Sequence, residues 1–333
     1  MARKKIVLSI DGGGIRGIIP AQILIHFERL LKEVYQDSTF KIADYFDLVA
    51  GTSTGGILGI AYLMPEHGRP MYTAEEVLKL YFDRGEDIFD IPFYHRLVSA
   101  GGFLDEKYPD KGLQETLQDY FGETKLNELL KPTLFTAYDI KRRKAHFFTQ
   151  HRASRPDHNF LVRDVARATA AAPTYFEPAK IRSESKDSFP LIDGGVFANN
   201  PSMCAYAEMR SSFSTPDKKV CAADVKILSL GTGFYHEPMN YSEVKDWGAS
   251  RWAKPLVDIM MSGIGETVDY ELTQLYDSVD SPEQYLRING EIPENVSPDL
   301  DNVEPGNLKA LQEFGNQLFF ENQEKILEFI KSQ

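Results

Sequence analysis

The sequence predicts an α/β fold in which helices cover both faces of a mainly parallel central sheet. The first observation is a set of short apolar runs, such as residues 4–10, 48–50 and 225–230, which are typical of strands buried on both faces. The second observation is that glycine-rich loops follow these runs and helix-like segments follow the first two of the loops. This alternation is typical of parallel sheets, whose ligands bind outside the carboxyl ends of the strands.

The expected elements begin with a strand over residues 4–10, a glycine loop, and a helix that Pro20 opens and that runs to about Tyr35. A second strand over 48–50 leads through a sharp turn into an apolar helical segment that ends near residue 63. The later elements are a helix over 73–84, strands over 132–139 and 145–149, a helix over 161–172, a strand over 225–230, and helices over 255–276 and 308–330.

One domain over residues 1–333 is expected, because the sequence contains no repeat, linker or low-complexity tract. Its 42% apolar residues are sufficient for a sizeable core. The motifs that carry chemistry all fall within about residues 4–235, and the part from about 250 to 333 is expected to be mainly helical. The oligomeric state is left open.

A formal charge of −12 argues against a nucleic-acid polymer as partner and against purely electrostatic docking on an anionic membrane. Cys204 and Cys221 lie far apart without metal-ligand spacing, so neither a metal site nor a disulfide framework is predicted. The apolar stretch near the N-terminus is too short for a signal-peptide core, and no later run would span a bilayer. The sequence therefore favours a cytoplasmic protein whose contact with membranes is peripheral.

The strongest candidate for a catalytic residue lies between the second expected strand and the helix after it. Residues 51–55 read Gly-Thr-Ser-Thr-Gly and match the G-x-S-x-G pattern. A serine on such a turn has a strained backbone, so its neighbours Gly51 and Gly55 must be small, and its hydroxyl meets a helix N-terminus that favours negative charge. Ser53 is therefore a candidate nucleophile. The alternative is a residue that only caps the next helix.

A second glycine-rich loop follows the first expected strand. Gly12, Gly14 and Gly17 satisfy G-x-G-x-x-G, but Asp11 would place a negative charge beside a dinucleotide pyrophosphate, which argues against that use. Consecutive glycine N–H groups can instead stabilise an oxyanion. Arg16 in the same loop either steadies it, meets a phosphate or forms a structural ion pair.

Three further stretches of the sequence are compatible with a functional role. Asp193 follows two apolar residues, which would bury its carboxylate, although Asp-Gly is commonly only a hairpin turn. Residues 88–104 mix apolar and aromatic side chains and fit either a mobile lid, a membrane-touching flap or a core-packing loop. Residues 141–167 contain eight basic against two acidic residues, which is compatible with a local anion site or with a solvated hairpin.

Three motifs in fixed order carry a family resemblance. Residues 11–17 (D-G-G-G-I-R-G), 51–55 (G-T-S-T-G) and 193–195 (D-G-G) resemble the motifs of the patatin-like phospholipases. The similarity continues through three further stretches and covers most of the chain up to about residue 235. Three ordered motifs are far more specific than any one of them. The further stretches are residues 43–46, 171–173 and 228–233.

The resemblance implies a three-layer α/β/α sandwich that needs no metal or cofactor and releases fatty acids from phospholipids or related acyl lipids at a membrane surface. It implies that Ser53 attacks the ester carbonyl and that Asp193 takes its proton. The same resemblance assigns the oxyanion hole to Gly12, Gly13 and Gly14. The residues that would support these groups are Arg16, Gly17, Gly51, Gly55, Gly194 and Gly195.

A dyad of this kind poses a chemical problem, because a carboxylate with an ordinary pKa near 4 is a poor base at neutral pH. Burial behind Leu191 and Ile192 would raise the pKa of Asp193. The competing mechanism is a triad that includes His236, the only histidine well placed after an expected strand end.

Two alternatives of another kind follow from the same resemblance. Some plant relatives are storage proteins, so the chain could be a binding or storage protein with Ser53 idle. Some bacterial relatives are antiviral effectors that cyclic nucleotides activate, and the basic residues 141–167 are compatible with such a small anionic activator.

Overall fold

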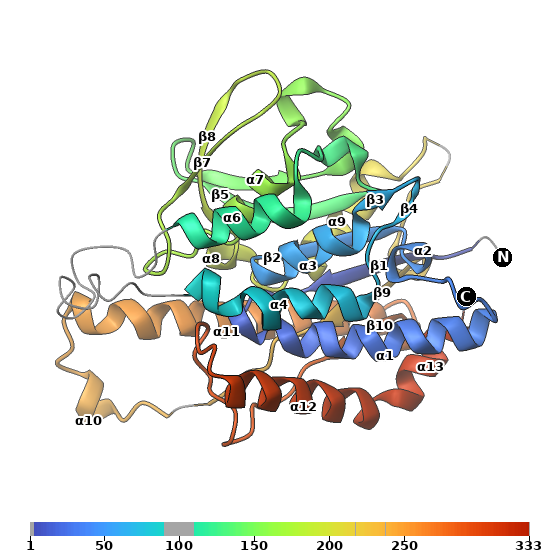
Figure 1. The fold of residues 1–333 in the computed structure, drawn as a ribbon. Helices are drawn as coiled ribbons and strands as arrows, with labels where there is room; N and C mark the ends of the chain where they lie inside the picture. Colours follow the sequence, from blue (N-terminus) through green and yellow to red (C-terminus); the bar gives the residue numbers. More distant parts are fainter. Residues whose placement is uncertain (1–2, 90–109, 217, 237, 333) are drawn as a thin grey trace.

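The computed structural model describes residues 3–89, 110–216, 218–236 and 238–332 (Figure 1). Its strands are β1 (Lys5–Ile10), β2 (Leu48–Thr52), β5 (Thr133–Asp139), β6 (Lys144–Phe148), β7 (Ala179–Arg182), β8 (Ser188–Asp193), β9 (Val225–Leu230) and β10 (Tyr285–Ile288), with β3 (Pro65–Glu66) and β4 (Arg69–Pro70) in a separate hairpin. The central sheet has the order β10-β9-β1-β2-β5-β8-β7, and β6 also pairs with β5. The pairs from β10 to β5 are parallel, whereas β6, β7 and β8 add antiparallel pairs, so the expected mainly parallel sheet is confirmed.

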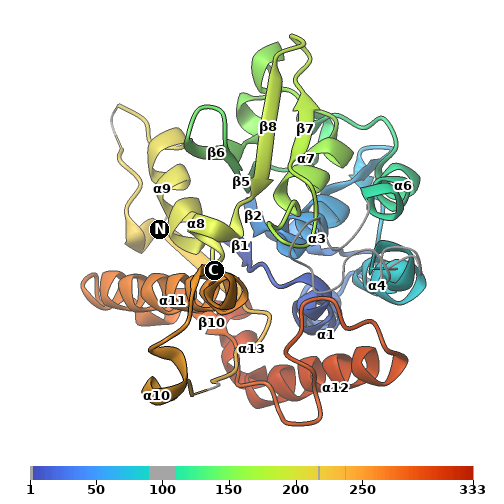
Figure 2. The same ribbon diagram turned by 90° about the vertical axis from the view of Figure 1, so that its left-hand side faces the viewer.

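Helices cover both faces of this sheet (Figure 2). Layers on the two sides are the arrangement predicted from the sequence. The helices are α1 (Ile18–Tyr35), α2 (Ile42–Tyr45), α3 (Thr54–Leu63), α4 (Ala74–Phe89), α6 (Asp110–Phe121), α7 (Val162–Thr169), α8 (Gly195–Ala198), α9 (Ser202–Ser212), α10 (Tyr241–Val244), α11 (Ala249–Asp277), α12 (Pro305–Glu321) and α13 (Gln323–Lys331).

Alternation of side chains along the strands creates two hydrophobic cores. Ile6 and Leu8 of β1 point to the core that α1, α3, α7 and α12 complete. Val7, between them, points to the other core, where Met209 of α9 and Tyr276 of α11 pack against the sheet. Figure 2 shows α9 and α11 on one side of the strands and α1 and α3 on the other.

Strands β2 and β8 meet end to end along one edge of β5. Because β6 pairs along residues 135–139 of β5, the strands β2 and β8 must share the opposite edge. Parallel β2 pairs Thr52 with Thr136, and antiparallel β8 pairs Asp193 with Ala137, the next residue. The carboxyl ends of β2 and β8 therefore meet head to head on one edge of β5.

The C-terminal part of the chain is mainly helical, but it also contains a strand, and its helix boundaries differ from the expected ones. Tyr285–Ile288 forms β10, which extends the central sheet by pairing with β9. The single helix expected over 308–330 is two helices, because α12 ends at Glu321 and α13 begins at Gln323. Helix α11 begins six residues before the expected Pro255, at Ala249, and contains that proline. The strand β7 was also not predicted.

The proposed lid and the absence of a membrane-spanning segment can be compared with the structure only over the described residues. Most of the proposed lid over 88–104 lies outside the described residues, although residues 88 and 89 continue α4. Among the helices that could be searched, none combines the length and apolar character that crossing a membrane requires.

Candidate active site

Ser53 sits on a strained elbow between β2 and α3. Its backbone has φ 56° and ψ −124°, a conformation that residues other than glycine rarely adopt. Its N–H donates to Thr169 Oγ1 at 2.9 Å, which helps to hold the turn. A Cβ built on Gly51 would lie 2.3 Å from the Gly55 carbonyl oxygen, and one on Gly55 would lie 2.2 Å from that of Ile10. The two glycines of the motif therefore allow close packing of the elbow.

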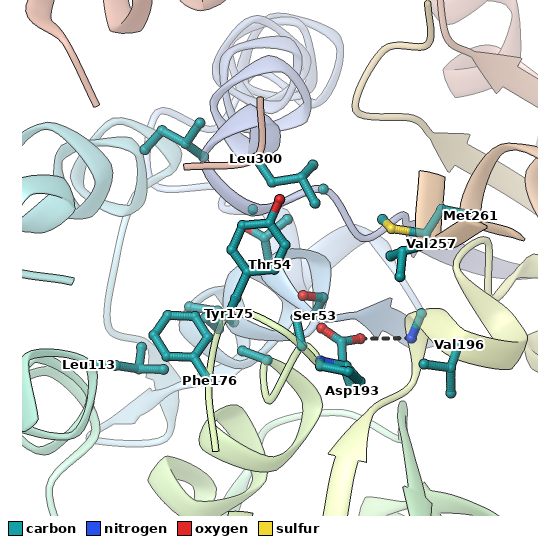
Figure 3. Close-up of a pocket in the computed structure, with 18 of the residues that line it drawn as sticks. Ser53, Thr54, Leu113, Tyr175, Phe176, Asp193, Val196, Val257, Met261 and Leu300 are labelled. Carbon is teal, nitrogen blue, oxygen red and sulfur yellow. Dashed lines mark hydrogen bonds between the residues drawn. The ribbon is translucent and has the colours of Figure 1, made fainter. Parts of the chain in front are cut away.

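Asp193 lies beside this serine because β2 and β8 end at adjacent residues of β5. The Asp193 side chain is buried and lies close enough to the Ser53 hydroxyl for that hydroxyl to lower its pKa. Its Oδ1 also accepts the Gly195 N–H at 2.7 Å (Figure 3). The sequence motifs 140 positions apart thus lie side by side in the fold.

Burial raises the pKa of Asp193 to about 6, against the opposing effects of the hydrogen bonds from Ser53 and from the Gly195 N–H. The cause is desolvation, which disfavours the charged carboxylate. A carboxylate with this pKa is ionised at neutral pH and is a better base than an exposed aspartate. The expected upward shift in pKa is therefore present.

Two residues of the glycine loop, Gly13 and Gly14, border the same space as Ser53. Gly12 N–H donates to the Asn199 carbonyl oxygen at 3.1 Å, so the amide for which an oxyanion role was predicted is already occupied. Within the part of the chain that the structure describes, no acceptor is found for the N–H groups of Gly13 and Gly14, and both residues line the pocket that contains Ser53. Gly14 opens a short 3₁₀ helix, η1 (Gly14–Gly17).

An apolar pocket surrounds Ser53 and Asp193. Its walls come from several parts of the chain, and the two polar side chains lie between them (Figure 3). A pocket with an apolar lining and a few convergent polar groups is the usual form of a small-molecule site. The labelled wall residues are Leu113, Tyr175 and Phe176 on one side and Val196, Val257 and Met261 on the other.

A family model described as patatin-like phospholipase matches residues 8–206. The chain belongs to the patatin-like phospholipase family. It is 34% identical to a probable inactive patatin of Solanum tuberosum, patatin-3-Kuras 1, over 94% of this chain and 85% of that protein. It is 33% identical to patatin-like protein 4 of Arabidopsis thaliana, over 95% of this chain and 83% of the relative.

The chain is also similar to a second patatin of Solanum tuberosum and to one solved bacterial structure. Patatin-T5 of Solanum tuberosum is 32% identical over 94% of this chain and 83% of its own length. The crystal structure of VipD from Legionella pneumophila aligns with 96% of this chain and 67% of that chain, with a TM-score of 0.37 and 15% identity. Membership of the patatin-like phospholipase family supports lipid acyl hydrolase activity in general, without naming a substrate.

The patatin-like glycine loop is anchored by residues beyond the part that the family model matches. Arg287 of β10 makes a bidentate ion pair with Asp11, with Nη1–Oδ1 at 3.0 Å and Nη2–Oδ2 at 2.6 Å. Thr232 Oγ1 donates to the Gly12 carbonyl oxygen at 2.8 Å. Ile15 N–H donates to the Leu300 carbonyl oxygen at 2.8 Å. Segments after β9 thus fix the loop on several sides.

Sequence reasoning missed Arg287. Asp11 is buried and the Arg287 side chain is 12% exposed. The pKa of Asp11 is raised because desolvation outweighs the attraction of Arg287. Arg287 stands in a short apolar stretch without a motif, so only the pairing of β10 with β9 could have indicated its position. Thr169 of α7, which accepts from the Ser53 amide, was missed as well, because only the packing of α7 beside the elbow brings these two residues together.

The supporting residues have packing roles. Arg16 is buried outside the pocket lining, and burial lowers its pKa although Asp258 opposes the change. This setting favours the structural reading of Arg16 over contact with a phosphate. A Cβ on Gly17 would lie 2.3 Å from Thr54 Oγ1, and one on Gly194 would lie 2.0 Å from Thr136 Oγ1.

The described histidines lie outside the lining of the pocket that holds Ser53 and Asp193. His236 is exposed, and its ring contacts Phe234 at a centroid distance of 5.3 Å. Of the histidines in the described part of the chain, none lines the pocket, and His95 lies outside that part. The geometry therefore favours a dyad over the triad with His236. Within the same residues, no cluster of histidine, cysteine and carboxylate side chains could hold a metal ion.

Four of the eight basic side chains in residues 141–167 form ion pairs. Arg142 pairs with Asp139, Arg152 with Glu208, Arg155 with Asp157 and Arg163 with Glu123. Ion pairs of this kind compete with an external anion for the guanidinium groups. The charge imbalance in the sequence is therefore weak support for a nucleotide site.

The Asp193→Asn variant should be more stable than the wild type at pH 8. Because the pKa of Asp193 is raised from 3.8 to about 6, the folded state binds its proton more tightly than the unfolded state. This cost to stability is absent near pH 4, grows as the pH rises and reaches at most about 3 kcal/mol above pH 6. Asparagine is neutral throughout and avoids it.

Urea unfolding of both proteins at pH 8 and pH 5 checks this expectation. The excess stability of Asp193→Asn should shrink at the lower pH. Asp246→Asn is the control, because its side chain is 84% exposed and the same charge is removed. A variant as stable as the wild type at both pH values would contradict the buried, ionised carboxylate.

The Arg287→Met variant should lose about 3 kcal/mol or more of unfolding free energy, because Asp11 is left buried without its countercharge. The double variant Asp11→Asn with Arg287→Met removes both charges and should be less destabilised than Arg287→Met alone. The free energies of urea unfolding of the wild type, Asp11→Asn, Arg287→Met and the double variant form a double-mutant cycle, which measures the coupling between the two side chains. Additive losses would show that the two side chains are not coupled.

Proposed function

We propose that the protein is a serine-dependent lipid acyl hydrolase of the phospholipase A type, with Ser53 as nucleophile and Asp193 as base. The observation that carries this proposal is that the Ser53 hydroxyl and the buried Asp193 carboxylate lie together inside one apolar pocket. The strained backbone of Ser53 adds support, because strain of this kind accumulates at functional sites.

In the first half of the reaction, Asp193 accepts the hydroxyl proton as Ser53 Oγ attacks the ester carbonyl carbon. The carbonyl oxygen becomes an oxyanion that accepts hydrogen bonds from the N–H groups of Gly13 and Gly14. Their position in the pocket lining supports this role. Collapse of the tetrahedral intermediate breaks the ester bond. Protonated Asp193 gives its proton to the leaving alcohol, and the acyl group stays on Ser53.

In the second half, a water molecule attacks the acyl-enzyme and Asp193 takes its proton. The same two amides stabilise the second oxyanion. Collapse releases the fatty acid, and Asp193 returns the proton to Ser53 Oγ. The carboxylate thus alternates between base and acid, which requires a pKa not far below the working pH. The raised pKa of Asp193, about 6, supports this role.

The pocket lining supports an acyl chain as the group bound next to the reacting ester. Leu113 and Phe176 on one side and Val257 and Met261 on the other offer apolar contacts to a hydrocarbon chain. A phospholipid or a related acyl lipid at a membrane surface fits these contacts better than a small polar ester does.

The alternative of an idle storage or binding protein remains a distinct hypothesis, and one relative is itself named a probable inactive patatin. The retained contact between Ser53 and Asp193 supports the active form for this chain. A single domain, a cytoplasmic location and activation by a cyclic nucleotide stay predictions from the sequence.

Lipid analysis of mixed phospholipid vesicles tests the proposal. The wild type should release fatty acid and lysolipid, and Ser53→Ala and Asp193→Asn should each lower this rate by about a thousandfold or more. Ser211→Ala, an exposed serine of α9, is the matched control and should keep the wild-type rate. Equal release by wild type and Ser53→Ala would favour the idle alternative.

A further inference from the structure

Exposed apolar side chains gather near the N-terminal half of α11. Of the ten large hydrophobic residues that are exposed in the described part of the chain, five fall between residues 239 and 260. Three of them lie on α11 itself, where Leu256 is 49%, Ile259 43% and Met260 39% exposed. Exposed apolar clusters of this kind mark interaction surfaces more often than isolated side chains do.

The two tryptophans of the protein lie in the same region. Trp247 and Trp252 are partly exposed, and their rings contact each other with centroids 5.4 Å apart. Trp252 and the three α11 side chains follow helical spacing, so they share one face of the helix. We call Trp247, Trp252, Leu256, Ile259 and Met260 the α11 face.

The α11 face is continuous with the active-site pocket. Met260 belongs to the α11 face and also lines the pocket, together with Val257 and Met261 on the neighbouring side of the helix. In Figure 3, Val257 and Met261 lie on the side of the pocket opposite Tyr175. A molecule resting on the α11 face is therefore beside the entrance to the Ser53 site.

The segment that carries the α11 face has no net charge, unlike the strongly acidic chain as a whole. Residues 239–263 contain three acidic and three basic side chains, which cancel, whereas the chain as a whole carries −12. A locally neutral surface avoids the repulsion that an acidic one would meet at a membrane. Tryptophan and apolar side chains near a neutral surface are typical of proteins that lie in the membrane interface.

We infer that the α11 face docks on the surface of a phospholipid bilayer and delivers acyl chains to the pocket. This inference rests on the proposed function, because the acyl pocket gives the α11 face its occupant. Leu256 and Ile259 enter the interface, with the two tryptophans at the level of the headgroups. Met260, shared by both surfaces, then forms part of the apolar path from the membrane to Ser53.

Binding is tested with phosphatidylcholine vesicles and full-length protein that carries Ser53→Ala, so that the lipid is not consumed. Because both tryptophans lie in the α11 face, their fluorescence should shift to shorter wavelength as vesicles are added. The double variant Leu256→Asp with Ile259→Asp should reduce vesicle sedimentation by about tenfold or more. Phe320→Asp, 60% exposed on α12 and so outside the α11 face, is the control and should bind normally.

Activity separates this inference from the proposed function. With an active Ser53, the double variant should lose about tenfold or more of phospholipid hydrolysis on vesicles, but keep its rate on a soluble short-chain ester. Neither substituted residue lines the pocket. Vesicle binding equal to that of the control would overturn the docking inference even if Ser53 is catalytic. Loss of the soluble-ester rate with Ser53→Ala tests the catalytic role by itself.

A second copy of the chain is the other occupant that an apolar face could accept. Light scattering of the Ser53→Ala protein and of the double variant decides this point. A dimer that the double variant abolishes, together with unchanged vesicle binding, would overturn the inference. If the aspartates lower stability, Leu256→Ser with Ile259→Ser replaces them, since both positions are largely exposed.

Discussion

One edge of β5 is the constraint on which the candidate site depends. Main-chain pairing fixes Thr52 opposite Thr136 and Asp193 opposite Ala137, so the ends of β2 and β8 have no freedom to separate. A slip of β8 by one residue would turn the carboxylate of Asp193 to the other face of the sheet. Two strands that run in opposite directions thus deliver a hydroxyl and a carboxylate to one place, although their motifs are far apart in sequence.

Several features at this junction cost stability. Ser53 has a strained backbone, Asp193 is buried with a raised pKa, and Asp11 is a second buried carboxylate. The contacts that offset these costs come from the sheet and from the C-terminal part of the chain, where Arg287 neutralises Asp11. The last hundred residues therefore complete the site even though the family model ends before them, and α11 adds one wall of the pocket. Strain held in place by its surroundings is typical of sites that must be ready before the ligand arrives.

The sequence was sufficient to locate Ser53 and Asp193, because the glycines around them are required locally and leave recognisable patterns. Buried strands were equally clear, since their apolar runs are uninterrupted. What could not be predicted depends on pairing between distant segments. The four residues of β10 look like any short apolar stretch until β9 lies beside them, and Arg287 has no signal apart from that register. The occupied amide of Gly12 likewise depends on the Asn199 carbonyl, which no local pattern indicates.

The most direct test of the central claim is the rate at which a fluorophosphonate labels Ser53 as a function of pH. If Asp193 is the base, the rate in the wild type should rise with pH and reach half its maximum near pH 6, where the carboxylate loses its proton. Asp193→Asn should label at least about a hundredfold more slowly without this dependence, and His236→Ala should behave like the wild type. Equal labelling of Asp193→Asn and wild type across the pH range would contradict the account.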